Sequence, residues 1–288
     1  MIFNETFTLS NGVKIPKLAL GTWLIEGEAA KNAVKNAIEI GYRHIDTAQA
    51  YGNEAEVGEG IRESGVKRDE IFVTSKVAAE NKSYSSAMQS IDGSLQKAKL
   101  DYLDLILIHS PQPWKEVNQS DNRYYEENKE VWRAMEDALK AGKLRSIGIS
   151  NFLEDDIKNI TADCSVKPMV NQLLAHISNT PLDLIEYCQK EGIVVEAYSP
   201  IAHGEALKNP IIGKISEKYG VSAAQLCLKY ALQLDMVVLP KTESAQHMRE
   251  NARLEFEITP EDMELLKNTE HIRDYGDSSF FPVYGGKL

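Results

Sequence analysis

Residues 71–109 read IFVTSKVAAENKSYSSAMQSIDGSLQKAKLDYLDLILIH, and two short apolar runs in this stretch flank a longer segment with helical periodicity. The apolar runs are Ile71–Val77 and Leu103–His109, and the segment between them is Ser85–Lys99. Short runs rich in branched apolar residues predict buried strands. A strand, a helix and a strand in this order are typical of a βαβ unit, in which the two strands run parallel.

The same alternation extends from about residue 17 to residue 251. The predicted strands are Lys17–Leu20, His44–Asp46, Ile71–Val77, Leu103–His109, Ser146–Ser150, Met169–Leu173, Val194–Ser199 and Val237–Pro240. The predicted helices are Ala29–Ile40, Glu54–Ser64, Ser85–Lys99, Glu126–Ala141, Leu153–Ile160, Leu182–Glu191, Ile211–Tyr219, Ala223–Leu234 and Ala245–Asn251. Eight parallel strands at a regular spacing of roughly 30 residues favour a closed barrel over an open doubly wound sheet. We therefore expect an α/β fold, a single (β/α)8 TIM barrel that takes residues 1–288 as one domain.

Turn and cap residues support these boundaries. Asn11-Gly12 lies between two apolar runs of the segment Phe3–Pro16, which predicts a β-hairpin that plugs the bottom of the barrel. Thr180-Pro181 and Asn209-Pro210 each place a cap residue before a proline at the first helical position. Thr259-Pro260 predicts one more helix after the eighth unit.

Composition limits the possible partners and the compartment. The hydrophobic content is 43%, and no apolar run approaches the ~20 residues needed to span a membrane. The first segment does not resemble a signal peptide. We therefore expect a soluble cytoplasmic protein. A net charge of −11 argues against a nucleic acid or an anionic membrane as partner. The three cysteines, Cys164, Cys188 and Cys227, are too widely spaced for a disulfide framework or a zinc site, so we expect buried thiols.

Polar residues at strand ends are the candidates for chemistry, because barrel enzymes carry the active site at the carboxyl ends of their strands. Asp46, Lys76 and His109 each end an apolar run. The two-residue period of a strand predicts that Lys76 and His109 point into the barrel. Tyr51 follows Asp46 in a Gly-containing turn, from which it could lean over the same mouth.

These four residue types can form a proton-transfer centre. A lysine paired with a carboxylate lowers the pKa of an adjacent phenol from its usual ~10, so we expect Tyr51 to exchange a proton near neutral pH. A neutral histidine can hydrogen-bond a carbonyl oxygen and orient it. The spacing alone does not identify the reaction, and solvated strand-end caps are the alternative interpretation.

Eight stretches resemble the aldo-keto reductase family in the family's own order. They are Gly41–Ala48 (GYRHIDTA), Tyr51–Glu54, Ser75-Lys76, Ile108-His109, Gly148–Phe152 (GISNF), Asn171-Gln172, Ala197–Pro200 (AYSP), and Pro240–Thr242 with Glu250-Asn251. Each one is short, but together they span nearly the whole chain. The sequence resembles a bacterial branch of the family and is similar to the diketogluconate and aldehyde reductases.

The resemblance implies a role for each matched residue. Tyr51 would be the general acid in NAD(P)H-dependent reduction of an aldehyde or ketone, Lys76 and Asp46 would tune it, and His109 would orient the carbonyl. The cofactor-binding residues that the resemblance implies are Thr22, Trp23, Ser150, Asn151, Gln172, Tyr198, Ser199, Lys241, Thr242, His247, Glu250 and Asn251. The substrate-binding candidates are Trp23, Tyr51, His109, Trp114 and, from a C-terminal substrate loop, Phe280, Phe281 and Tyr284. No residue is assigned to a metal, and the resemblance implies a monomer.

Two departures from the family pattern matter. His247 stands where the family usually has an arginine that contacts the 2′-phosphate of NADP, and a neutral imidazole holds a phosphate less tightly than a guanidinium. We therefore expect NADPH to be preferred and NADH to be used measurably. Leu174–Ile177 (LAHI) replaces a glutamate and a His-Pro pair found in many members.

Two other function classes compete with this interpretation, and the retained set of Asp46, Tyr51, Lys76 and His109 argues against a loss of catalysis. One is a non-catalytic NADP(H)-binding subunit that senses redox state. The other is a metal-dependent barrel hydrolase, which would need paired histidines on the first strand, and Lys17–Leu20 has none. Neither the physiological substrate nor the reaction direction follows from the sequence.

Overall fold

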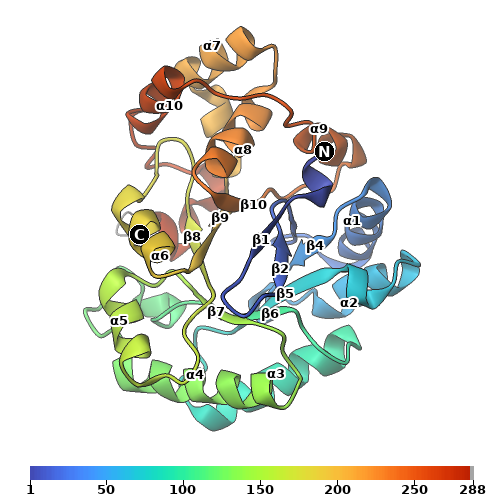
Figure 1. Ribbon diagram of the computed structural model, residues 1–288, viewed down its shortest axis with the longest axis vertical. Helices are drawn as coiled ribbons and strands as arrows, with labels where there is room; N and C mark the ends of the chain where they lie inside the picture. The colour runs from blue at the N-terminus through green and yellow to red at the C-terminus, as the bar shows by residue number, and fades with distance from the viewer. Residues whose placement is uncertain (286–288) are drawn as a thin grey trace.

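A closed ring of parallel strands forms the centre of the computed structural model, which describes residues 1–285 (Figure 1). The main sheet of this part has eight strands in the order β10-β9-β8-β7-β6-β5-β4-β3. They are β3 (Leu20–Gly21), β4 (His44–Asp46), β5 (Phe72–Val77), β6 (Leu105–Ile108), β7 (Ile147–Ser150), β8 (Val170–Leu174), β9 (Val194–Tyr198) and β10 (Met236–Leu239). The predicted (β/α)8 barrel is confirmed.

The barrel closes between its first and last strands. The backbone N–H of Ala19 donates to the carbonyl of Val238 at 3.0 Å, and the N–H of Val238 donates to the carbonyl of Lys17 at 2.9 Å. The regular first strand is therefore shorter and later than the predicted Lys17–Leu20, although the predicted residues do pair. In each of the five strands β4, β5, β6, β7 and β8, every residue is buried, as expected for strands covered on both faces.

Helices cover the outside of the ring (Figure 1). They are α1 (Gly27–Ile40), α2 (Glu54–Glu63), α3 (Tyr84–Ala98), α4 (Tyr125–Lys140), α5 (Glu154–Asp163), α6 (Leu182–Lys190), α7 (Pro210–Tyr219), α8 (Ala223–Gln233), α9 (Ala245–Asn251) and α10 (Pro260–Lys267). The extra helix predicted after Thr259-Pro260 is α10, with the Thr259 hydroxyl accepting from the N–H of Asp262. Asn209 caps α7 in the same way.

The α6 helix departs from the predicted cap. It begins at Leu182, one residue after the proline that was expected to open it, because Pro181 has a ψ of 72° and is not helical. The hydroxyl of Thr180 donates instead to the carbonyl of His176 at 2.9 Å.

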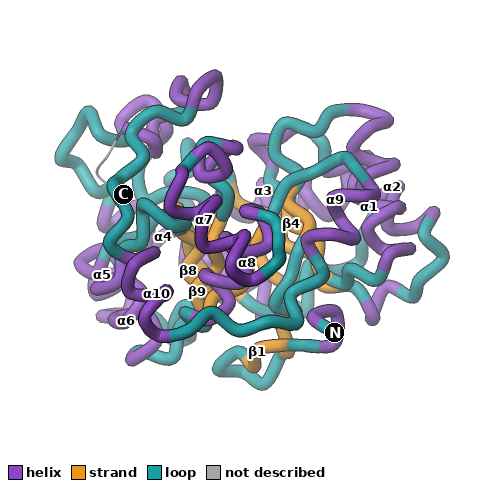
Figure 2. Tube along the Cα trace, turned by 90° about the horizontal axis from the view of Figure 1, so that it is seen from above, coloured by secondary structure: helices purple, strands orange, loops and turns teal. Residues whose placement is uncertain are grey.

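The N-terminal hairpin pairs β1 (Thr6–Thr8) with β2 (Lys14–Pro16) in antiparallel register. Its turn contains Asn11, whose side-chain amide donates to the carbonyl of Arg145, just before the start of β7. Leu9 and Ile15, which belong to this hairpin segment, are buried. The hairpin therefore covers the amino ends of the barrel strands, as predicted, and β1 lies at the lower edge of the view in Figure 2.

The cysteines, possible metal ligands, possible membrane helices and the C-terminal segment can now be compared with the predictions. Cys188 and Cys227 are buried, as expected, but Cys164 is half-buried because it follows α5 at the surface. Within residues 1–285, no three His, Cys, Asp or Glu side chains are grouped to hold a metal ion. No helix of the same part is long and apolar enough to cross a membrane. The C-terminal segment ends in two short 3-10 turns, Gly276–Phe280 and Pro282–Gly285.

Candidate active site

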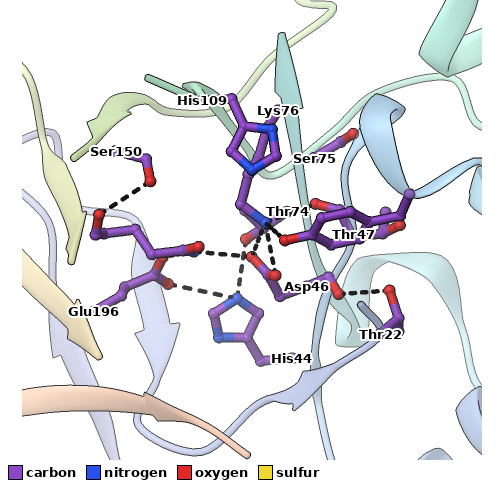
Figure 3. A network of polar contacts seen from close by, with 12 residues as sticks. Thr22, His44, Asp46, Thr47, Thr74, Ser75, Lys76, His109, Ser150 and Glu196 are labelled. Carbon is purple, nitrogen blue, oxygen red and sulfur yellow. Dashed lines mark hydrogen bonds and ion pairs between the residues drawn. The ribbon is translucent and has the colours of Figure 1, made fainter. Parts of the chain in front are cut away.

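The four residues predicted to form the catalytic centre converge at one end of the barrel, where Figure 3 shows three of them, Asp46, Lys76 and His109. Asp46 ends β4, Lys76 lies in β5, His109 follows β6, and Tyr51 lies in the 3-10 turn Gln49–Tyr51. The Lys76 ammonium donates to both carboxylate oxygens of Asp46, at 2.7 and 2.9 Å. The same nitrogen lies 3.3 Å from the hydroxyl of Tyr51. The fold therefore brings a phenol, an amine and a carboxylate into contact.

Burial and charge act in opposite directions on this centre. The side chain of Lys76 is completely buried, and a fourth contact joins its ammonium to the carbonyl of Thr47 at 2.9 Å. Burial lowers the pKa of Lys76, but Asp46 and then Tyr51 raise it by more, so the ammonium stays charged. Four acceptor oxygens, two from Asp46 and one each from Thr47 and Tyr51, surround its three N–H groups, so the ammonium is fully hydrogen-bonded.

The expected effect on Tyr51 is only partly right. Lys76 does lower the pKa of the phenol, but burial is the larger effect and the net pKa is raised above its ordinary value of 10.0. The carboxylate of Asp46 adds to the rise. The sequence shows which charges are near but not how strongly the closed barrel removes water from the hydroxyl, and desolvation disfavours the charged phenolate.

His109 packs against two aromatic rings. Its imidazole lies edge-on to Trp114, with ring centroids 4.8 Å apart, and 5.7 Å from the ring of Tyr51. Burial, followed by the nearby Lys76, holds the pKa of His109 well below 6.5. The ring is therefore neutral, and its buried Nδ1 has no hydrogen-bond partner within residues 1–285.

A cavity of about 320 Å³ opens above these residues. Many of the predicted site residues line it, namely Thr22, Trp23, Asp46, Tyr51, His109, Trp114, Ser150, Asn151, Gln172, Tyr198, Ser199, Lys241, Phe281 and Tyr284. Lys76 does not line the cavity itself, but its ammonium contacts two residues that do, Asp46 and Tyr51.

One wall of the cavity is a hydrogen-bonded set of side chains from β7, β8 and β9. The amide nitrogen of Asn151 donates to the carbonyl of His109 at 3.1 Å, and its oxygen accepts from the hydroxyl of Tyr198 at 2.8 Å. Ser150 donates to the backbone carbonyl of Gln172. The backbone of Asn151 has a φ of 63°, which asparagine tolerates better than most residues. These contacts fix the wall in one arrangement.

Four predicted cofactor residues lie away from the cavity. Thr242 precedes α9 and accepts from the N–H of Ser244, His247 and Glu250 lie on α9, and Asn251 ends it. His247 is exposed, whereas Asn251 is buried. These residues are near Lys241 in the chain, so they could contact only a ligand that extends from the cavity toward α9.

The aromatic wall, which consists of Trp23, Trp114, Phe281 and Tyr284, closes the other side of the cavity. Phe281 lies 4.7 Å from Trp114 and 5.3 Å from Trp23, measured between ring centroids. Phe280 does not line the cavity and is 71% exposed, so the structure does not place this predicted substrate residue in the pocket. Phe280 ends the 3-10 turn Gly276–Phe280, whereas Phe281 follows it in an extended conformation.

Several pocket residues were not predicted. Gly21, Leu24, Pro200, Ile201, His203, Gly204 and Leu239 also line the cavity. Glu196 lies below it in β9, within the run Val194–Tyr198 (VVEAY), and its carboxyl group contacts Gln172. A charged residue at the centre of an apolar strand was the signal for Glu196 in the sequence.

The donor groups of the pocket suit a nicotinamide cofactor. The polar groups of Ser150, Asn151 and Gln172 match the hydrogen-bonding needs of a carboxamide, and the ring of Tyr198 offers a flat apolar surface. Lys241 places a cation at the opposite rim, where a phosphate could bind.

Comparisons with known proteins identify the family. The sequence model of the Aldo/keto reductase family matches residues 17–270. The glyoxal reductase of Bacillus subtilis (strain 168) is 42% identical over 264 residues, which are 91% of each chain. The 9,11-endoperoxide prostaglandin H2 reductase of Trypanosoma cruzi is 38% identical over 96% of this chain and 95% of that protein. The structure of a Bombyx mori aldo-keto reductase in complex with NADP has a TM-score of 0.86 and 32% identity, with 98% of each chain covered. The chain therefore belongs to the aldo/keto reductase family.

Proposed function

We propose that this protein reduces an aldehyde or ketone to the alcohol, with a nicotinamide cofactor as hydride donor and Tyr51 as proton donor. The observation that carries the proposal is the 3.3 Å contact between the Tyr51 hydroxyl and the buried, charged Lys76 ammonium at the floor of the cavity. A phenol in this position can give a proton to a carbonyl oxygen as negative charge develops on that oxygen.

The raised pKa of Tyr51 supports this direction of proton transfer. The phenol stays protonated before the reaction, and Lys76 stabilises the phenolate that remains afterwards. Neutral His109 can donate a hydrogen bond to the substrate carbonyl without adding a charge to the site. Asp46 acts through Lys76 and has no direct contact with Tyr51 in this scheme.

NADPH is the cofactor that we propose, and it would supply the hydride when bound. The carboxamide would contact Ser150, Asn151 and Gln172, the ring would stack on Tyr198, and Thr22, Trp23 and Ser199 would complete the cavity. Lys241 and Thr242 would meet the ribose phosphate, with Glu250 and Asn251 at the adenine. Two solved relatives, one from Bombyx mori, are named as complexes with NADP and NADPH. The exposed His247 lacks the permanent charge of an arginine, so we also propose measurable use of NADH.

The aromatic wall supports an apolar or ring-bearing carbonyl compound as substrate. One relative is named as a glyoxal reductase, so small dicarbonyl compounds belong in the same test panel. We further propose that residues 1–288 act as one barrel domain in a cytoplasmic monomer, with no nucleic-acid or membrane partner. Light scattering on the purified protein and cell fractionation test these last points.

The experiment is to follow nicotinamide absorbance with NADPH or NADH against aldehydes, ketones and sugars, using the wild type and Tyr51→Phe. We expect kcat/KM of Tyr51→Phe to fall by roughly 10²–10⁴, the range for loss of a positioned general acid. The Kd of the cofactor should change by less than about threefold, because the ring remains in place. Undiminished turnover in Tyr51→Phe would contradict the assignment of the proton donor. Cofactor binding with no turnover on any carbonyl would instead support a non-catalytic redox-sensing subunit.

A further inference from the structure

The barrel interior holds a second carboxyl group that the proposed reaction does not use. Glu196 lies in β9 with its side chain completely buried, beside Asp46 (Figure 3). Its Oε2 accepts a hydrogen bond of 2.8 Å from Nε2 of Gln172, and the same nitrogen donates to Oδ2 of Asp46 at 2.9 Å. A side-chain amide nitrogen carries two protons. Gln172 therefore bridges two carboxyl groups.

The other oxygen of Glu196, Oε1, has no hydrogen-bond partner within residues 1–285, and it lies 3.7 Å from Nε2 of His44. His44 Nδ1 lies 3.3 Å from the carbonyl of Pro16, and Nε2 lies 2.9 Å from the hydroxyl of Thr74. A carbonyl can only accept, so Nδ1 carries the proton and Nε2 is an acceptor. Burial lowers the pKa of His44 to about 3, which keeps the ring neutral. Nε2 already accepts from the Thr74 hydroxyl, so His44 offers Oε1 no hydrogen-bond donor.

The charges around Glu196 do not allow a second carboxylate without cost. The titratable groups that face it are His44 and Asp46 from β4 and Lys76 from β5. The neighbouring strand β8 presents the uncharged amide of Gln172, and β10 is entirely apolar (MVVL). The single positive charge, on Lys76, is already paired with Asp46. Burial, and then Asp46, raises the pKa of the Glu196 carboxyl from 4.5 to about 8.

We infer that Glu196 is a positioning residue of the active site, held as a neutral carboxylic acid, which orients Gln172 so that its amide supports Asp46 and thereby Lys76. The proton of Glu196 lies on Oε1, because Oε2 accepts from Gln172 and no group within residues 1–285 donates to Oε1. Both amide protons of Gln172 go to the carboxyl groups, which leaves its carbonyl oxygen free for the cavity that Gln172 lines. The consequence for catalysis rests on the proposed function, whereas the charge state of Glu196 does not.

Loss of the Glu196 proton would change the centre electrostatically. Above about pH 8 the interior gains a negative charge close to Asp46 and Lys76. A further negative charge raises the pKa of a nearby phenol, so Tyr51 becomes a weaker acid. We therefore expect kcat/KM for carbonyl reduction by the wild type to decline in this pH range.

Glu196→Gln tests the positioning role with a neutral side chain of the same shape. Its oxygen can accept from Gln172 as Oε2 does, and its uncharged amide nitrogen takes the place of Oε1. We expect kcat/KM at about pH 7 to stay within about threefold of the wild type, and the alkaline decline to move up by about one pH unit or more. Glu54→Gln is the matched control, because Glu54 is also buried and its Oε1 accepts from Ser75, outside this network. The control should keep the wild-type pH profile.

Two measurements test the charge state without turnover. The first is a titration of the wild type, labelled with ¹³C in its glutamate carboxyl groups, by NMR. One resonance, absent from Glu196→Gln, should titrate more than two pH units above ~4.3, the ordinary value for glutamate. The second is the free energy of unfolding. A raised folded-state pKa stabilises below the unfolded value, so the wild type should lose stability relative to Glu196→Gln as pH rises from about 4.5 to about 8.

The inference is overturned if the Glu196 resonance titrates below about pH 5.5, or if the stability difference stays constant over this range. An alkaline decline that is identical in the wild type and Glu196→Gln would overturn the link to Tyr51. If no carbonyl is reduced at all, the proposed function fails, and the NMR and unfolding results still decide whether Glu196 is neutral.

Discussion

Replacing Lys76 by methionine should damage stability as well as activity. The side chain of Lys76 is completely buried, and its ammonium contacts Asp46, Thr47 and Tyr51 at 2.7–3.3 Å. Methionine keeps most of the apolar volume but removes the charge. The carboxylate of Asp46, which is 5% exposed, then loses the Lys76 ammonium and keeps the hydrogen bond from the amide of Gln172.

The expected magnitude follows from the cost of an unpaired buried charge. Breaking a buried ion pair by removing one partner costs about 3–5 kcal/mol. For a chain of 288 residues this corresponds to a fall in Tm of about 5–8 °C. Removal of both charges in Lys76→Met/Asp46→Asn should recover about 1–3 kcal/mol relative to the sum of the single changes, because no carboxylate is left unpaired.

Urea unfolding at about pH 7, followed by circular dichroism, measures all four proteins of this cycle. Asp46→Asn serves as the second single variant, and cofactor binding checks that each variant keeps the barrel. A cost below about 1 kcal/mol for Lys76→Met would refute the reasoning, because surface pairs already reach that value. Strict additivity in the double variant would refute it as well.

Three further outcomes are expected. His247→Arg should raise the ratio of kcat/KM with NADPH to kcat/KM with NADH by about tenfold or more, because it places a permanent charge at the phosphate. A ratio that is already above about a thousandfold in the wild type would contradict the proposed use of NADH. Gly58→Ala should lower the free energy of unfolding by more than about 2 kcal/mol, because the new Cβ would clash with the backbone oxygen of Ala98. Gly93→Ala is the control: it has open space around it and should raise the free energy of unfolding by up to ~1 kcal/mol in the same assay. Phe281→Ala should raise KM for an aromatic aldehyde by about fivefold or more and leave KM for a two-carbon aldehyde nearly unchanged. Phe280 is exposed, so Phe280→Ala should change neither KM. Equal effects of the two variants would argue against the aromatic wall.

Sequence patterns account for most of the architecture. Apolar runs and their two-residue period predicted seven strands to within two residues of their observed bounds, and placed Lys76 inside the barrel. The strand-end position of Asp46 and the turn at Tyr51 predicted that these groups share one rim. Such inferences succeed because the alternation of side chains and the parallel direction of the strands are local properties that sequence carries directly.

Other features depend on contacts between distant segments. The first strand is hard to delimit from the sequence, because its register is completed by hydrogen bonds to Val238, more than 200 residues away in the chain. The exposure of Phe280, in contrast to Phe281 beside it, depends on how the C-terminal turn packs against Trp23 and Trp114.

The sequence by itself determined the barrel, the family resemblance and the identity of the groups at its rim. Only the tertiary structure decided their protonation. Closure of the barrel removes water from Tyr51 and from Glu196, and desolvation of a buried acid outweighs the single lysine that they share. That balance depends on distances and burial across β4, β5, β8 and β9, which no one segment of the chain contains.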